Sequence, residues 1–215
     1  MPIPSGQDEI IKTSAKERVY NTLQGWIIDG TMQPQERISD ADLAQYFSVS
    51  RTPVREAIQM LIEQGLVYSV PSSGTFVSPI DKNDMVQLYF ALSEVQTLCL
   101  SLGFSSITDA VLDKLSLINN TFLHNLQYDT PVEVMNTDRE FHTIIAELSD
   151  NSYLVDFTSR LMLKAYRHEI LFFCQRVDPQ RSYRLHEEII DLIRHKDLCG
   201  ASKKLKENWK ISVRE

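Results

Sequence analysis

The chain has 215 residues, of which 43% are hydrophobic, so it can bury a sizeable core, and its length favours two domains over one. It contains no run of about 18 apolar residues and no charged leader followed by an apolar segment, which predicts neither a membrane span nor a signal peptide. Its three cysteines are scattered and odd in number, which favours reduced thiols and a cytoplasmic protein over a disulfide framework.

The net charge of −7 excludes a protein that binds nucleic acid through bulk positive charge. Neither half of the chain is basic: residues 1–79 hold six Lys and Arg against nine Asp and Glu, and residues 80–215 hold sixteen against twenty. Any affinity for DNA must therefore come from the local placement of a few arginines, and we expect it to be strongly salt-sensitive.

The first elements in chain order are two helices. Residues 1–13 show no periodicity and are expected to form a loose arm, whereas apolar residues recur at helical spacing from 14 to 29 and stop at Gly30. Ser39 and Asp42 have the spacing of a capping box, which predicts that a short helix begins there and ends at Phe47.

A second short helix and a hairpin follow. Ser50 is placed to cap this helix, Pro53 fits its first turn, and an apolar stripe continues to Gly65, which suits the left-handed position after a helix. Two short helices joined by a few residues are typical of a helix-turn-helix. Strand-forming residues on both sides of residues 71–74 then predict a β-hairpin, so residues 39–78 are expected to form a winged helix-turn-helix.

Beyond Asp81 glycine is nearly absent, and the pattern is helical to the end of the chain. Breaks rich in Asp, Asn, Pro and Gly divide it into six predicted helices: 81–103, 108–127, 131–149, 151–177, 181–196 and 198–213. Six helices of this length predict an all-α bundle. The fold class is therefore mainly α, with a DNA-binding domain at residues 1–79 and an all-helical domain at residues 80–215.

Arg51 and Arg55 are the predicted base readers. They lie one turn apart on the helix face opposite Val54, and an arginine fork matches the O6 and N7 acceptors of guanine in the major groove. Ser50 and Thr52 stand at the helix N-terminus, where amides and the helix dipole favour phosphate. Two arginines on an exposed face would, in isolation, be better explained as merely solvated, but here the capped helices and the hairpin occur together in the order that a winged helix requires.

Arg37 and Gly74 complete the predicted DNA contacts. Arg37 precedes the first helix of the motif and is placed to reach a phosphate or a base, and Gly74, expected at the tip of the wing, would allow a close backbone approach to the minor groove. The hairpin itself contains neither Lys nor Arg.

Asp138, His142 and His186 form a candidate metal site in the helical domain. The first two are spaced i, i+4 and face the same side of a helix, and His186 could add a third ligand from another helix. An Asp–His pair at this spacing is also common as a surface hydrogen bond. Three ligands with an open position would suit a metal-dependent hydrolase, but no nucleophile motif or phosphate loop accompanies them; a third alternative is a ligand-free bundle that only dimerises.

The winged-helix segment resembles the GntR-type bacterial regulators over residues 14–79. The resemblance rests on Ser50-Arg51-Thr52-Pro53-Val54-Arg55-Glu56-Ala57, Leu61, Gly65-Leu66-Val67 and Gly74-Thr75-Phe76-Val77. It implies a homodimer that binds a palindromic operator, with contacts from Arg37, Arg51, Thr52, Arg55 and Gly74. One departure is Pro34-Gln35, where the family usually has Pro-Gly.

Residues 80–215 resemble the FCD effector domain of the FadR-like branch, of the six-helix VanR type. Asp138-Arg139-Glu140-Phe141-His142 matches its D-x-x-F-H motif, and the resemblance implies that an Asp and three His bind a divalent metal, zinc or nickel, which holds a carboxylate effector. The last of these histidines falls at Asn208 here, a weaker ligand for such metals. Leu92 and Gln96 stand where the family often has Arg and Glu. The sequence thus predicts an effector-controlled repressor rather than an enzyme.

Overall fold

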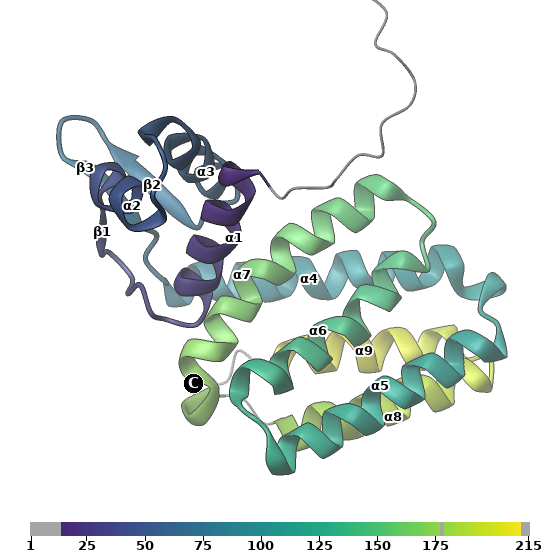
Figure 1. Ribbon diagram of the computed structural model, residues 1–215. Helices are drawn as coiled ribbons and strands as arrows, with labels where there is room; N and C mark the ends of the chain where they lie inside the picture. The colour runs from purple at the N-terminus through teal and green to yellow at the C-terminus, as the bar shows by residue number, and fades with distance from the viewer. Residues whose placement is uncertain (1–13, 177–178, 212–215) are drawn as a thin grey trace, which may run out of the picture. The chain divides into compact units, whose positions relative to one another are not determined.

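The computed structural model describes residues 14–176 and 179–211, and the predicted arm at residues 1–13 lies outside them. The described chain divides into two compact units. The winged-helix unit comprises the residues up to Ile27 together with Gln33–Ser78, and the bundle unit comprises Ile28–Met32 and the residues from Pro79 onward. Figure 1 shows the mixed helices and strands of the first unit and the purely helical second unit.

The winged-helix unit contains the elements that the sequence predicts. In chain order they are α1 (Ala15–Ile28), β1 (Arg37–Ile38), α2 (Asp40–Phe47), α3 (Arg51–Glu63), β2 (Val67–Val70) and β3 (Gly74–Val77). Each helix buries one apolar face in a common core. The fully buried side chains of this core include Val19, Leu23, Ile27, Val54, Leu61 and Val77.

The helix ends confirm most of the predicted caps and correct one. Ser39 Oγ accepts a hydrogen bond from Asp42 N at 3.3 Å, so the hydroxyl half of the predicted capping box forms. Gly65 follows α3 with a φ of +73°, the left-handed conformation that glycine adopts without steric cost. Ser50 occupies the N-cap position of α3, but its hydroxyl makes no capping hydrogen bond to that helix. The capping bond expected of Ser50 was therefore wrong, and the exposed hydroxyl stays available for another acceptor or donor.

The wing is a three-stranded antiparallel sheet in the order β1-β3-β2. Val67 pairs with Val77 and Val70 with Gly74, which confirms the predicted hairpin, and Arg37 pairs with Phe76 across β1 and β3. The sequence did not predict β1, because a strand of two residues is too short to show an alternating pattern. Its formation joins Arg37 to the wing.

The turn before β1 carries the departure from Pro-Gly. Gln35 has a φ of +68°, in the left-handed region that glycine favours, and its backbone N donates to Val77 O at 2.9 Å. The turn thus keeps the shape that a glycine would give, and its attachment to the end of β3 offsets the steric cost of a side chain.

The bundle unit confirms the six predicted helices within the described residues. They are α4 (Lys82–Gly103), α5 (Asp109–Tyr128), α6 (Pro131–Glu147), α7 (Ser152–Arg176), α8 (Pro179–Arg194) and α9 (Leu198–Ile211), with a short 3₁₀ turn, η1 (Phe104–Ser106), after α4. The predicted boundaries that fall on described residues agree to within two residues. The helix breaks are readable because capping residues such as Thr130, which forms a full capping box with Glu133, mark them.

Helix α4 packs against α6, α7 and α9 (Figure 1). At its end Gly103 approaches α6 so closely that a Cβ atom would lie 1.9 Å from the carbonyl oxygen of Leu148. Among the described residues, Asn83–Ser106 is the one segment long and apolar enough to cross a membrane, and half of that window is buried inside the protein. Helix α4 thus buries one side against the three other helices and exposes the other.

Candidate nucleic-acid interface and metal centre

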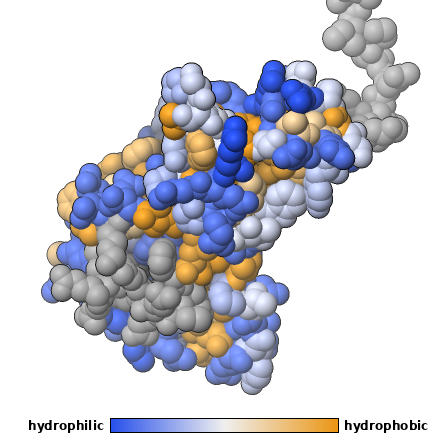
Figure 2. All heavy atoms as spheres, turned by 90° about the vertical axis from the view of Figure 1, so that its left-hand side faces the viewer, coloured by the Kyte–Doolittle hydropathy of each residue, from blue (hydrophilic) through white to orange (hydrophobic). Residues whose placement is uncertain are grey.

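Helix α3 separates an apolar face from a polar one. Val54, Ala57, Ile58 and Leu61 are buried, whereas Arg51 and Arg55 are exposed, as the i, i+4 spacing predicts. Ser50 and Thr52, at the start of the helix, are also exposed. Strongly hydrophilic side chains gather over the winged-helix unit in the upper part of the face shown in Figure 2.

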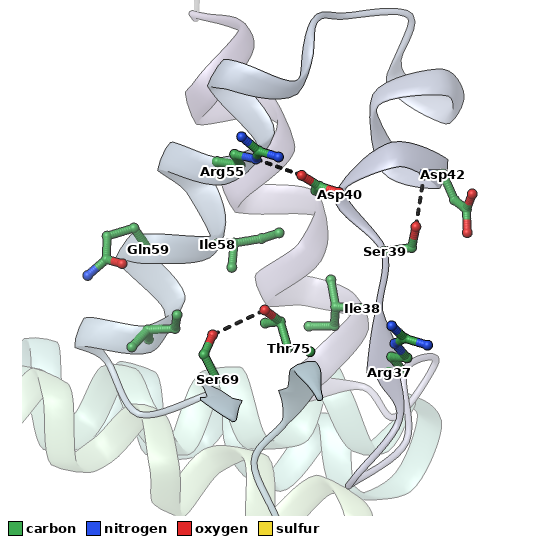
Figure 3. A pocket seen from close by; sticks show the side chains of 12 residues that line it. Arg37, Ile38, Ser39, Asp40, Asp42, Arg55, Ile58, Gln59, Ser69 and Thr75 are labelled. Carbon is green, nitrogen blue, oxygen red and sulfur yellow. Dashed lines mark hydrogen bonds and ion pairs between the residues drawn. The ribbon is translucent and has the colours of Figure 1, made fainter. Parts of the chain in front are cut away.

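A groove of about 650 Å³ lies between α3, the start of α2 and the wing. Figure 3 shows its lining, in which three elements distant in sequence meet; the residues include Arg37, Ser39, Asp40, Arg55, Gly74 and Thr75. Ser69 and Thr75 face each other across β2 and β3, with their hydroxyl oxygens 3.1 Å apart. The structure therefore brings Arg37, Arg55 and Gly74, three of the predicted DNA contacts, to one groove.

Arg55 is tied to α2 by an ion pair. Its Nε donates to Asp40 Oδ2 at 2.6 Å, while 66% of the Arg55 side chain remains exposed. The hydrogen bond from Arg55 lowers the pKa of Asp40, with further Coulombic contributions from Arg55 and Arg51. Asp40 is thus ionised at neutral pH and holds one edge of the guanidinium.

Gly74 leaves room for Arg37. A Cβ atom on Gly74 would lie 3.1 Å from Nε of Arg37, and Gly74 has a φ of +129°, a conformation that side chains rarely adopt. Gly74 is the first residue of β3 and not the tip of the hairpin, which is formed by residues 71–73. The hairpin itself contains no basic side chain, but β1 adds Arg37 to the same sheet.

The second candidate site lies in the middle of the bundle. Asp138 and His142 come from α6, His186 from α8 and Asn208 from α9, and all four side chains are buried. A ligand atom from each of Asp138, His142 and His186 lies within 4.8 Å of the others. The structure therefore brings together the residues that the sequence predicts as metal ligands.

The carboxyl oxygens of Asp138 face the Nε2 atoms of two histidines in this cluster. His142 Nε2 lies 3.8 Å from Asp138 Oδ2, and His186 Nε2 lies 3.7 Å from Asp138 Oδ1. Within the described residues, Asp138 Oδ1 and His186 Nε2 are buried without a hydrogen-bond partner. Buried polar atoms are rarely left in this state in folded proteins, and a bound ion is one partner that would satisfy them.

The tautomer of His142 is set by Gln96 on α4. Gln96 Nε2 donates to the backbone carbonyl of His142 at 2.9 Å, and Gln96 Oε1 accepts from Trp209 Nε1 at 3.2 Å, so the amide orientation is fixed. His142 Nδ1 lies 2.8 Å from the same Oε1 and must therefore donate to it. The proton on Nδ1 leaves the lone pair of Nε2 directed at Asp138.

Asn119 on α5 sets the tautomer of His186 in the same way. Its Nδ2 donates to Glu187 Oε1 at 2.6 Å and to the carbonyl of Tyr183 at 3.3 Å, which leaves Oδ1 to accept. His186 Nδ1 lies 3.1 Å from that oxygen. Metal-binding histidines in proteins are usually held by such an acceptor on the second ring nitrogen.

Burial keeps both imidazoles neutral. Burial lowers the pKa of His142 to about 3, an effect that a hydrogen bond with Asn208 partly opposes, and burial and the neighbouring His142 place the pKa of His186 well below its usual value. Burial also raises the pKa of Asp138 to about 7. Among the described residues no positive charge contributes to the pKa of Asp138, so a bound cation would stabilise its ionised form.

Asn208 completes the ring of acceptors. Its Nδ2 donates to Ser182 Oγ at 3.0 Å, so its side-chain oxygen is the atom that faces His142. The proposed donor set is thus one carboxylate, two imidazoles and one amide oxygen, which fits a divalent metal ion by chemistry, and the spacing of Asp138, His142 and His186 fits it as well.

Sequence reasoning did not assign Gln96, Asn119 and Trp209 to the site. In the sequence Gln96 is only a departure from a common acidic residue, and a buried amide on a different helix leaves no local spacing signal. The remaining histidines fit the expectation of surface or satisfied core residues: His124 and His195 are exposed, and His168 Nδ1 lies 2.9 Å from the hydroxyl of Tyr89. Leu92 is packed in the apolar core.

These two sites define a DNA-binding transcriptional regulator with a small-molecule effector domain. The sequence profile of the gntR family of bacterial regulatory proteins matches residues 15–77, and that of the FCD domain matches residues 87–209, more than half of the chain. The chain belongs to the gntR family of regulators that carry an FCD domain. The alternative of a metal-dependent hydrolase is not favoured by either match.

Curated relatives are similar over most of their length. The HTH-type transcriptional regulator YdhC of Bacillus subtilis is 25% identical over 187 residues, which are 83% of this chain and 80% of that protein. The Nta operon transcriptional regulator of Aminobacter aminovorans is 27% identical over 79% of this chain and 80% of its own. The gluconate operon transcriptional repressor of Bacillus licheniformis is 25% identical over 84% of this chain and 73% of its own.

Two solved structures share the fold. A GntR transcriptional regulator from Rhodococcus sp. RHA1 has a TM-score of 0.72 and 27% identity, covering 92% of this chain and 95% of that chain. McbR/YncC of Escherichia coli has a TM-score of 0.77 and 19% identity, covering 93% of this chain and 95% of that chain. Both comparisons span the winged helix and the bundle together.

Proposed function

We propose that this chain is a cytoplasmic, homodimeric repressor that binds a palindromic operator and releases it when a small molecule binds at a divalent metal in the bundle. Residues 1–79 serve as the DNA-binding domain and residues 80–215 as the effector-binding and dimerisation domain. Two of the relatives are named as repressors, that of the gluconate operon of B. licheniformis and RspR of E. coli, which favours repression here.

The observation that carries the DNA half is the exposed polar face of α3 beside the groove. Arg51 and Arg55 project from this face, and Arg37 reaches the same groove from β1. Ser50 and Thr52 offer hydroxyls and backbone amides at the start of α3, where phosphate binds well. In this proposal the arginines read bases, the hydroxyls set the position along the DNA, and Gly74 leaves room for Arg37 and for a close approach of the backbone to the minor groove.

This half can be tested by selection from a random duplex library with the full-length protein. We expect a two-fold symmetric preferred sequence, and Arg51→Ala or Arg55→Ala should each lower the discrimination between preferred and scrambled duplexes by about 5-fold to 150-fold, since a bidentate contact supplies about 1–3 kcal/mol. Arg184→Ala, which removes an exposed arginine from α8, is the charge-matched control. Unchanged discrimination in both α3 variants would show that another surface reads the bases.

The observation that carries the metal half is the convergence of buried acceptors from Asp138, His142, His186 and Asn208. We propose that they bind zinc, nickel or a harder divalent ion, since Asn208 replaces an imidazole by an amide oxygen. Elemental analysis of the protein purified without chelator should find about one divalent metal per chain. A protein that never retains metal, and whose operator affinity is unaffected by added zinc, nickel or manganese, would leave the bundle as a ligand-free dimerisation scaffold.

Homodimerisation is supported by an exposed apolar surface on two packed helices. Val86, Phe90, Leu98 and Leu102 on α4 and Tyr153 and Phe157 on α7 are each at least 46% exposed. Helices α4 and α7 pack side by side, so these residues lie on neighbouring elements. Large exposed apolar residues grouped in this way mark interaction surfaces, and a second copy is the partner that a two-fold symmetric operator requires.

Sedimentation of a matched pair of variants tests this surface. Leu98→Glu on α4 should convert a dimer to a monomer, whereas Leu117→Glu, an exposed leucine on α5, should leave the dimer intact. A wild-type protein that sediments as a monomer at micromolar concentration would contradict the proposal directly.

A further inference from the structure

We infer that Asp40 is a positioning residue for DNA recognition: it holds the guanidinium of Arg55 by Nε and so leaves both terminal nitrogens of Arg55 to bind a base. This inference rests on the proposed role of Arg55 as a base reader. It explains why Asp40, an acidic residue, lies on the face that is proposed to bind the negatively charged DNA.

The geometry of the pair supports this role. Arg55 Nε donates to Asp40 Oδ2 at 2.6 Å, and an arginine whose Nε is occupied keeps Nη1 and Nη2 as its free donors. These two nitrogens form the fork that binds the O6 and N7 of guanine. Figure 3 shows Arg55 and Asp40 directed at each other at the upper end of the groove.

The rigidity of Asp40 supports it as well. Asp40 is the first residue of α2, and the bond from Asp42 N to Ser39 Oγ fixes the start of that helix. An exposed arginine has many rotamers, so a fixed partner removes part of the entropy that is lost when the arginine binds. The exposed fraction of the Asp40 side chain is 30% against 66% for Arg55, so the carboxylate is the better held member of the pair.

The negative charge of Asp40 opposes DNA binding unless the residue has another role on this face. A carboxylate beside phosphate groups weakens the general attraction of DNA to this face. Asp40 nevertheless remains ionised, because the hydrogen bond from Arg55 lowers its pKa. A second carboxylate, Asp42, lies two residues further on and lines the same groove, but Figure 3 shows it on the other side of Ser39, directed away from Arg55.

Asp40→Asn and Asp42→Asn in the full-length protein therefore form a matched pair. Both remove one negative charge from the start of α2, and fluorescence anisotropy would measure the affinity for the duplex selected by the wild type and for a scrambled duplex of the same composition. We expect Asp42→Asn to raise the affinity for both duplexes equally and so to leave unchanged the ratio of the affinity for the selected duplex to that for the scrambled duplex. Asp40→Asn should lower the ratio by roughly threefold to tenfold, part of what the whole arginine contact supplies.

Two further variants separate positioning from folding. Asp40→Glu keeps the carboxylate and should restore most of the ratio, and Asp40→Asn added to Arg55→Ala should lower the ratio no further than Arg55→Ala alone. Thermal melts should agree between the two Asn variants, because exposed ion pairs contribute little to stability.

The outcomes separate this inference from the proposed function. If Asp40→Asn behaves like Asp42→Asn while Arg55→Ala lowers the ratio, Arg55 reads bases without help and the positioning role is wrong. If Asp40→Asn tightens the selected duplex more than Asp42→Asn does, the ion pair competes with DNA, which also overturns the inference. If Arg55→Ala keeps the full ratio, the proposed reading of bases by Arg55 fails, and the inference fails with it.

Discussion

The winged-helix unit and the bundle unit each contain an aspartate at a proposed site, and their surroundings shift the pKa values of the two side chains in opposite directions. Asp40 lies at the surface, where the hydrogen bond from Arg55 lowers its pKa. Asp138 lies inside the bundle between two neutral imidazoles, where burial raises its pKa to about 7. Asp40 is paired with the guanidinium of Arg55, whereas none of the described residues around Asp138 supplies it with a positive charge.

This difference separates two kinds of site. The surface site consists of side chains on a helix and a sheet whose partner, DNA, brings its own charge and shape. The buried site is assembled from several helices, α4 and α5 supplying the amides that orient the histidines and α6, α8 and α9 supplying the acceptors. Changes at the buried site should therefore have larger and more interdependent effects on binding than changes at the surface.

The largest effect is expected from removing a metal ligand. His142→Ala should lower the affinity for zinc or nickel by more than the roughly 10-fold to 100-fold typical of an orienting residue, because it deletes a coordinating atom. Isothermal titration of chelator-treated protein measures this directly. His124→Ala, on the surface of α5, is the control, and an equal loss in both variants would contradict the assignment of the site.

A smaller loss is expected when only the orientation of a ligand is disturbed. Gln96→Leu leaves every proposed ligand in place but removes the acceptor for His142 Nδ1 and for Trp209 Nε1. We expect the metal affinity to fall roughly 10-fold to 100-fold. Nitrogen NMR of the metal-free protein should show the proton of His142 on Nδ1 in the wild type and on both nitrogens in exchange in the variant.

Thr97→Val is the control for Gln96→Leu. It removes a neighbouring polar group of α4 whose hydroxyl donates to the carbonyl of Ser93 at 2.6 Å, away from the ligands. A normal NMR signature in Gln96→Leu would mean that packing alone holds the ring of His142.

The pH dependence of metal binding follows from Asp138. Its pKa is raised to about 7, whereas that of His142 is lowered to about 3, so Asp138 is the ligand that takes up a proton as the pH falls from 8 to 5. The metal competes with that proton, so affinity should be nearly constant above pH 7 and decrease by about tenfold per pH unit below it. Metal titrations at pH 5.5, 6.5 and 7.5 check this. A decrease in affinity of about 100-fold per pH unit, which corresponds to two protons released per metal ion, would contradict neutral histidines.

The smallest expected effect compares one glycine from each unit. Gly25 lies in α1, and a Cβ atom added there would have no other atom within 4 Å, so Gly25→Ala should raise the free energy of unfolding by about 0.5–1 kcal/mol. Gly103→Ala should lower it instead, because its Cβ would meet the carbonyl of Leu148. Thermal or urea unfolding measures both signs, and a stabilised Gly103→Ala would show that α4 and α6 can separate at little cost.

The elements of both units could be predicted from sequence because they depend on local chemistry. Thr130 with Glu133, Gly65 after α3 and the apolar stripe through Leu61 each act within a few residues of themselves. Strand β1 and the orientation of Ser50 could not be predicted in this way. The first depends on pairing with β3, which lies nearly forty residues further along the chain, and the second on the exact direction of one hydroxyl.

The sequence by itself determined the fold class, the helix-turn-helix and the spacing of Arg51 with Arg55 and of Asp138 with His142, since helical periodicity alone places such pairs on one face. Only the tertiary structure decided that Asp40 meets Arg55, that Gly74 makes room for Arg37, and that Gln96 and Asn119 direct two imidazole lone pairs toward Asp138. These contacts join residues from separate elements, and their physical consequences depend on burial and hydrogen-bond direction, which exist only after the elements have packed.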